Sequence, residues 1–119
     1  MLNVYGLKNC DTCRKAIKWL TDAGIAHEFC DLRAQPVSQE EVARWMAAVG
    51  PDVLVNRRGT TWRKLSDDEK AVSDVDGLID LMMTYPAIIK RPVFDFGDTC
   101  VVGFTDAARI EIDQRAARG

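Results

Sequence analysis

The hydrophobic positions of the first 32 residues follow a period of two, then a helical period, then a strand pattern again. Residues 2–5 alternate and are rich in strand-forming types, which predicts a short β-strand. One helical face follows at the i, i+3, i+4, i+7 spacing, formed by Cys13, Ala16, Ile17 and Leu20. Gly24 supplies a stop for this helix, and residues 26–32 form a second predicted strand. A strand–helix–strand unit of this length predicts two parallel strands.

The middle of the chain carries mainly helical patterns. Two capping boxes, Ser38 with Glu41 and Ser66 with Glu69, mark helix starts. Two apolar helical faces follow these boxes, formed by Val42, Trp45, Met46 and Val49 and by Val75, Leu78, Ile79 and Met82. The loop 56–62 interrupts them. Residues 36–84 are therefore predicted to be an all-helical insertion.

The last third returns to strands. Residues 87–94 and 99–104 are predicted strands on either side of a hairpin turn at Gly97-Asp98, and a polar-rich helix over 107–117 closes the chain. The order βαβ, helices, ββα predicts an α/β, thioredoxin-like fold. We expect a single domain, residues 1–119, whose core is formed by residues 1–35 and 85–119.

The composition excludes several classes of partner. The chain has 119 residues, and 47% hydrophobic and 29% charged residues are typical of one soluble domain. A net charge of −2 gives no footprint for direct nucleic-acid binding. No apolar stretch approaches the roughly 20 residues of a membrane span, and the N-terminus lacks a signal-peptide pattern. We therefore expect a cytoplasmic protein without membrane or direct nucleic-acid contact.

Four cysteines in a chain without an export signal are expected to be reduced. Cys30 and Cys100 are isolated and are expected to be structural. His27 is the only histidine. A zinc site needs about four ligands, usually in close pairs, so no metal site is expected.

Cys10 and Cys13 form a C-x-x-C motif between the first predicted strand and the first predicted helix. The start of a helix favours an anion, so Cys10 is expected to be a nucleophilic thiolate. Asp11 or Asn9 is expected to help cap this helix. Cys13 lies one turn further on, where it either resolves an adduct by forming a disulfide with Cys10 or is a small buried core residue.

Five cations are candidates for a positive site: Lys8 lies just before the motif, Arg57 and Arg58 lie in the predicted loop, and Lys90 and Arg91 lie just before Pro92. A nearby cation lowers the pKa of a thiol and can hold an anionic substrate, and arginine can clamp a carboxylate with two hydrogen bonds. The alternative is that all five are solvated surface charges. Arg91-Pro92 falls where the thioredoxin-like fold carries a cis proline beside its thiol, and the sequence leaves the isomer open.

Three segments, residues 4–12, 56–65 and 86–92, carry a resemblance to a known family, and residues 102–104 fit its last strand. In them the chain resembles the arsenate reductase/Spx superfamily, most closely its YffB-like branch. The resemblance implies a thioredoxin-like fold, a Cys10 nucleophile and Arg91 as an anion-binding group beside the sulfur. The predicted catalytic residues are therefore Cys10, Cys13 and Arg91, and the predicted substrate-binding residues are Lys8, Asn9, Arg58 and Arg91.

The chain departs from the arsenate reductases of this family at three places, one of which is their loop arginine, because it aligns poorly with Asn56 or Arg57. These reductases also carry a histidine where this chain has Gly6, and an arginine in the last strand where it has Gly103. Arsenate reduction is therefore not carried over. The branch also often lacks a cysteine at position 13, so the resolving role of Cys13 depends on this sequence alone.

We predict a thiol–disulfide reductase in which Cys10 attacks an oxidised thiol or takes up glutathione. It would be an enzyme with no bound cofactor and with glutathione as co-substrate, as YffB-like proteins are thought to be. Two alternatives stay open. One is an arsenate reductase, in which Cys10 attacks arsenic. The other is an Spx-type redox-sensing transcriptional regulator, whose partner would be RNA polymerase.

Overall fold

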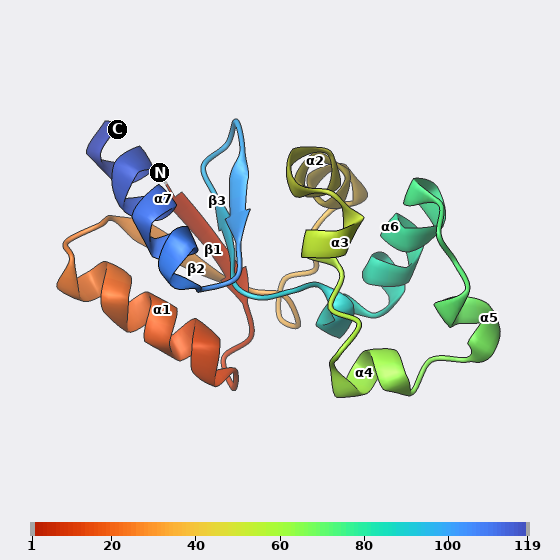
Figure 1. The fold of residues 1–119 in the computed structure, drawn as a ribbon. Helices are drawn as coiled ribbons and strands as arrows, with labels where there is room; N and C mark the ends of the chain where they lie inside the picture. Colours follow the sequence, from red (N-terminus) through yellow and green to blue (C-terminus); the bar gives the residue numbers. More distant parts are fainter. Residues whose placement is uncertain (1, 119) are drawn as a thin grey trace. The chain divides into compact units, whose positions relative to one another are not determined.

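The structure is a computed structural model that describes residues 2–118. The chain divides into two compact units (Figure 1). The first contains the residues up to Gln35 together with those from Arg91 onward, and the second is Pro36–Lys90. The second unit thus extends beyond residue 84, the predicted end of the insertion.

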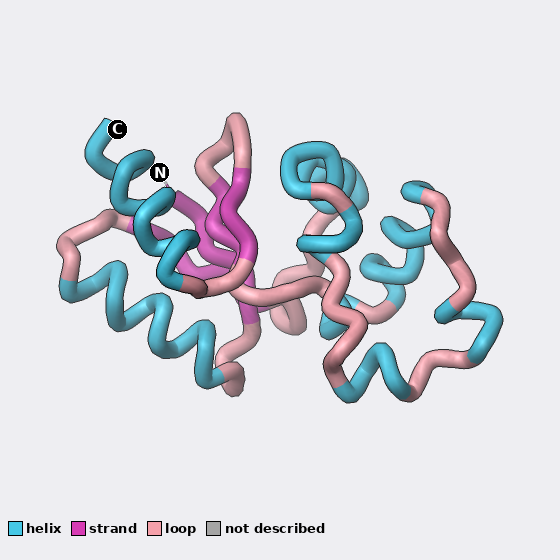
Figure 2. Tube along the Cα trace, viewed as in Figure 1, coloured by secondary structure: helices cyan, strands magenta, loops and turns pink. Residues whose placement is uncertain are grey.

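The first unit is built on a four-stranded sheet with the strand order β2-β1-β3-β4. β1 (Leu2–Gly6) is parallel to β2 (His27–Asp31), and α1 (Asp11–Asp22) makes the crossover between them. On its other side β1 pairs antiparallel with β3 (Val93–Asp95), which pairs antiparallel with β4 (Cys100–Val102). The predicted parallel pair and the α/β, thioredoxin-like fold are confirmed, and Figure 2 shows all the strands in this unit.

Two helices, α1 and α7 (Asp106–Arg118), pack against this sheet (Figure 1). Their shared core joins strand and helix residues, namely Leu2, Val4, Ala16, Leu20, Phe94, Val101, Ala108 and Ile112. The predicted apolar face of α1 is confirmed, since Cys13, Ala16 and Leu20 are buried. Gly24 follows this helix with φ +71°, the left-handed conformation that glycine adopts easily after a helix end.

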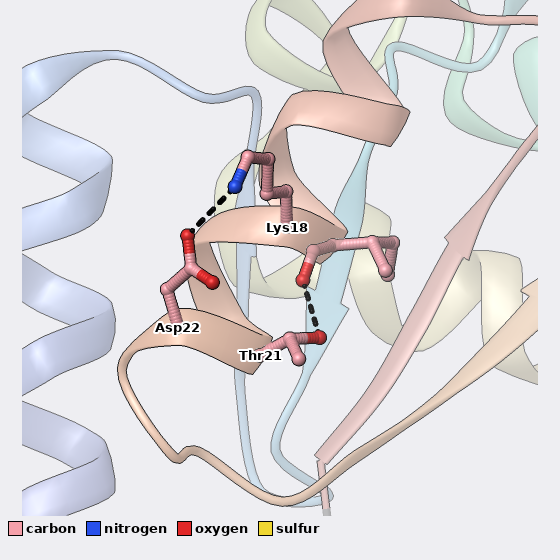
Figure 3. A network of polar contacts seen from close by, with 4 residues as sticks. Lys18, Thr21 and Asp22 are labelled. Carbon is pink, nitrogen blue, oxygen red and sulfur yellow. Dashed lines mark hydrogen bonds and ion pairs between the residues drawn. The ribbon is translucent and has the colours of Figure 1, made fainter.

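The opposite side of α1 is polar and exposed (Figure 3). Lys18 forms an ion pair with Asp22 one turn later at 3.1 Å, and the Thr21 hydroxyl donates to the Ile17 carbonyl at 2.9 Å. An exposed i, i+4 pair of this kind stabilises a helix by about 0.3–0.5 kcal/mol. Burial of the apolar face sets which side of α1 turns inward, and Cys13 lies on that side.

The second unit contains α2 (Gln39–Val49), α3 (Pro51–Leu54), α4 (Thr60–Arg63), α5 (Asp67–Lys70), α6 (Val75–Thr84) and the short 3-10 helix η1 (Pro86–Ile88). The Ser66–Glu69 capping box is reciprocal, and Ser38 accepts the Glu41 N–H at 3.2 Å. The predicted apolar face of α6 is wrong at Val75, which is 51% exposed. Val75 is the first residue after the Asp74 N-cap, and the buried residues of this helix begin one turn later, at Leu78.

The predicted strand over residues 87–94 is wrong in its first half. Pro86 instead begins η1, in which the Ile88 N–H donates to the Tyr85 carbonyl at 3.0 Å. The fixed φ of proline suits the first position of a helix. Ile89 then forms an isolated bridge to Val55, and pairing in the main sheet begins only at Val93. A short buried apolar run has the same sequence pattern in either structure, which explains the error.

The predicted hairpin turn between β3 and β4 is confirmed. Gly97 has φ +92°, and the buried Asp95 carboxylate accepts its N–H at 2.9 Å.

Within the described part of the chain, no helix is long and apolar enough to cross a membrane.

Candidate active site

Cys10 is the N-cap residue of α1, directly after the turn that leaves β1. Its N–H donates to the Leu7 carbonyl at 3.2 Å, and its carbonyl accepts the Arg14 N–H at 3.0 Å. The expected capping by Asp11 or Asn9 is wrong, because Asp11 is already helical and Asn9 is exposed in the turn. The half-buried Cys10 thiol therefore lies at the N-terminal end of the helix, beside the N–H groups of its first turn.

Opposing effects set the ionisation of Cys10. Burial is the largest single effect and raises its pKa. The Cys13 N–H and thiol, and the hydrogen bond and positive charge of Arg91, together outweigh burial, so the pKa of Cys10 lies below its ordinary value. This thiol is the one that the site prepares as a thiolate.

Cys13 behaves in the opposite way. Its side chain is buried, and burial is the main cause that raises its pKa to about 11. A hydrogen bond from the Leu7 N–H acts against this, while the thiol and charge of Cys10 raise the pKa further. Two adjacent groups whose pKa values are pushed apart can take different roles, here a thiolate and a protonated thiol.

Arg91 supplies the cation of the site, and the Arg91–Pro92 peptide bond is cis. The structure therefore brings together all three predicted catalytic residues, Cys10, Cys13 and Arg91. The Pro92 carbonyl accepts the Gly103 N–H at 2.9 Å, which ties the segment to the end of β4. Cys10 and Arg91 lie far apart in the sequence, and the antiparallel pairing of β1 with β3 brings their segments together.

The other predicted substrate-binding cations have different surroundings. Lys8 lies beside Asp31. The pKa of this carboxyl is lowered mainly by the Arg33 N–H, and the N–H and positive charge of Lys8 lower it further. Arg58 lies in the second unit, where its N–H donates to the Asn56 side chain at 3.1 Å. Substrate binding by Lys8, Asn9 and Arg58 stays a prediction.

A pocket of about 380 Å³ adjoins the buried thiol in the first unit. Apolar residues and three cations line it: Leu7, Lys8, Cys13, Arg14, Ile17, Lys18 and Phe29. The Arg14 side chain donates to the Lys8 carbonyl at 3.1 Å, which joins two cationic residues of the lining. The turn before α1, α1 itself and β2 all contribute residues to this pocket.

In the sequence, Gly6 stood out only because the arsenate reductases of the family carry a histidine there. In the structure, Gly6 lies against Cys13. A Cβ at Gly6 would be 2.6 Å from the Cys13 sulfur. The available signal was a glycine at the end of a strand pattern, which often marks close approach of another group.

The remaining cysteines lie outside this arrangement. Cys30 is half-buried in β2 opposite Tyr5, and Cys100 is buried at the start of β4; none of the four cysteines forms a disulfide. Among residues 2–118, no group of three or more His, Cys, Asp or Glu side chains is placed to hold a metal ion.

The sequence matches the ArsC family over residues 5–112. The chain belongs to the ArsC family. This confirms the resemblance to the arsenate reductase/Spx superfamily.

An uncharacterized protein of Haemophilus influenzae is 38% identical over 106 residues, 89% of this chain and 93% of the relative. The transcriptional regulator Spx of Listeria innocua is 26% identical over 108 residues, 89% of this chain and 82% of Spx. The solved structure of a protein called YFFB is 40% identical, covers 93% of this chain and 97% of its own, and has a TM-score of 0.88.

We expect Arg91→Met to raise the pKa of this ArsC-family thiol, because the change removes a hydrogen bond and a positive charge that favour the thiolate. Below the pKa, the thiolate fraction falls tenfold for each unit by which the pKa rises. The pKa is the midpoint of the rise in Cys10 alkylation with pH, followed by peptide mass spectrometry. In Arg91→Met that midpoint should move to higher pH.

Arg14→Met is the matched control for this experiment. Like Arg91→Met, it removes one positive charge, here from α1. The Arg14 guanidinium pairs with the exposed Asp11 at 3.5 Å and is not among the groups that shift the pKa of Cys10. Its midpoint should match the unmodified protein. Equal midpoints in all three proteins would show that Arg91 does not stabilise the thiolate.

Proposed function

We propose that the protein is a thiol–disulfide reductase in which Cys10 is the nucleophile and glutathione supplies the electrons. The observation that carries this proposal is the difference in pKa between two neighbouring thiols. The pKa of Cys10 is lowered, and burial raises that of Cys13 to about 11. A thiolate attacks disulfides and a protonated thiol does not, so the first attack belongs to Cys10.

The first step is attack of the Cys10 thiolate on one sulfur of an oxidised substrate. A bond forms between the two sulfurs, the substrate S–S bond breaks, and the other half leaves as a thiolate that takes up a proton from solvent. The Arg91 guanidinium is the fixed cation beside the reacting sulfur and would also attract the carboxylates of glutathione.

The second step is attack by Cys13 on the Cys10 sulfur of the mixed disulfide. Once Cys10 is bonded to substrate it carries no charge, so its contribution to raising the pKa of Cys13 disappears, although burial remains. Cys13 then loses its proton, bonds to Cys10 and expels the substrate as a thiol. Two molecules of reduced glutathione restore both cysteines and leave as oxidised glutathione.

Trapping with Cys13→Ser tests this sequence of steps. Treated with oxidised glutathione, the variant should accumulate one glutathionyl group on Cys10, because serine cannot expel it. The unmodified protein should pass on to a Cys10–Cys13 disulfide. Intact-protein and peptide mass spectrometry distinguish the two products.

Two results would count against the proposal. Absence of any glutathionyl adduct on Cys10 in the trapped variant would remove glutathione as the partner. A stable adduct in both proteins would show that Cys13 does not resolve it, so that a second glutathione performs that step.

A redox-sensing regulator is a second candidate, favoured by the similarity to Spx along most of the chain. In this function, the Cys10–Cys13 disulfide would alter a surface that RNA polymerase contacts. Affinity purification under reducing and oxidising conditions separates the candidates. RNA polymerase retained in one redox state alone would favour the regulator, and its absence in both states would remove it.

A further inference from the structure

Gly6, the last residue of β1, lies closer to the buried thiol than any side chain could. A Cβ built on Gly6 would lie 2.6 Å from the Cys13 sulfur, a separation that real Cβ atoms essentially never show. It would also lie 3.4 Å from the Cys13 Cβ and 3.4 Å from Cε1 of Phe29, which are tight but tolerable contacts. The sulfur is thus the one atom that excludes a side chain here.

Backbone conformation does not explain this glycine. Among the described residues, glycines with positive φ occur at positions 24, 50, 97 and 103, and Gly6 is not one of them. It is an ordinary strand residue that pairs with Asp31 of β2. Alanine could adopt the same backbone conformation, so the missing Cβ itself is what the site uses.

The Cys13 sulfur is held from several directions at once. The Leu7 N–H donates to it, the Cys10 sulfur shares a hydrogen bond with it, and the Gly6 backbone lies directly against it. We propose that Gly6 is a positioning residue, whose missing Cβ lets the Cys13 thiol occupy the place from which it stabilises the Cys10 thiolate and can attack the Cys10 sulfur. The attack rests on the proposed reductase function, while the stabilisation does not.

A methyl group at Gly6 would displace the sulfur without removing it. The pocket of about 380 Å³ that Cys13 lines together with Ile17 and Phe29 provides room for the displaced atom. Displacement weakens the hydrogen bond between the two thiols, and it moves the attacking sulfur away from its target. A misplacement of about 1 Å can slow a reaction roughly 100-fold.

Four proteins test the proposal: the unmodified chain, Gly6→Ala, Cys13→Ala, and the double variant. The first measurement is the pH midpoint of Cys10 alkylation by iodoacetamide. Gly6→Ala and Cys13→Ala should each move the midpoint to higher pH, since each removes the thiol contact that favours the thiolate. Adding Gly6→Ala to Cys13→Ala should cause no further movement, because the displaced atom is already absent.

The second measurement is the rate at which the Cys10 mixed disulfide closes to the Cys10–Cys13 disulfide. Gly6→Ala should close roughly 10–100-fold more slowly than the unmodified protein. A defect that is merely structural would lower the urea midpoint of unfolding without changing the alkylation midpoint or the closure rate.

Two results would overturn the proposal. One is an equal shift of the alkylation midpoint by Gly6→Ala in the presence and absence of the Cys13 sulfur. The other is an unchanged midpoint and closure rate in Gly6→Ala. Should Gly6→Ala fail to fold, the double variant decides: recovery of folding supports the clash with the sulfur, and continued misfolding refutes it.

The outcome is separable from the proposed function. Alkylation needs no glutathione, so the midpoints report on Gly6 even if the protein never forms a mixed disulfide. A protein inert to glutathione that still shows the coupled midpoints would lose the reductase function and keep the positioning role.

Discussion

Cys10→Ser is expected to lower the rate at which reduced glutathione reduces a disulfide substrate to background, a loss on the order of 1000-fold or more. A serine hydroxyl does not ionise near neutrality and forms no disulfide. None of the groups that favour the Cys10 thiolate can therefore compensate for the missing sulfur. The rate is followed by coupling the oxidised glutathione produced to glutathione reductase.

Cys30→Ser is the matched control for the loss of Cys10. It is the same chemical change in the same unit, at a half-buried cysteine of β2 that is not among the groups acting on Cys10. This variant should keep nearly full activity. Substantial activity in Cys10→Ser, or an equal loss in both variants, would exclude Cys10 as the nucleophile.

Ile112→Ala is expected to give the largest loss of stability, about 2–5 kcal/mol in the free energy of unfolding. Ile112 is fully buried on α7, in the core that this helix shares with β1, β3, β4 and α1. Truncation leaves a cavity that the surrounding strands can fill only partly. The midpoint of urea unfolding, at unchanged slope, measures the loss.

Ile110 offers a control on the same helix. It is 61% exposed, so Ile110→Ala makes the same change in helix propensity without opening a cavity. Its effect should stay within about 0.5 kcal/mol. Similar losses in the two variants would mean that α7 does not pack on the sheet through Ile112.

The parts of the fold that the sequence predicted well are those with a long local period. The alternation of β1 and the spacing of Cys13, Ala16 and Leu20 gave the strand–helix–strand unit, and connection length gave the parallel pairing. The failures occurred where the signal is short. The buried pair Ile88 and Ile89 fits a strand as well as a 3-10 turn, and only the fold decides between them.

The candidate site divides in the same way. Cys10 and Cys13 were predicted from a motif placed between a strand and a helix. The contact of Arg91 with Cys10 depends on strand pairing across most of the chain, and it was expected only from the predicted fold and from a family resemblance. The contact of Gly6 with the Cys13 sulfur was missed, because a sequence does not state how closely two neighbouring segments approach in space.

The first unit takes its sulfur from one end of the polypeptide and its guanidinium from the other. A ribosome therefore delivers Cys10 long before it delivers Arg91, and the sulfur reaches its full acidity only when β3 has joined β1. Until then the nascent chain carries Cys10 without the cation that favours its thiolate. The rate of alkylation of Cys10 can accordingly serve as a clock for the completion of the sheet.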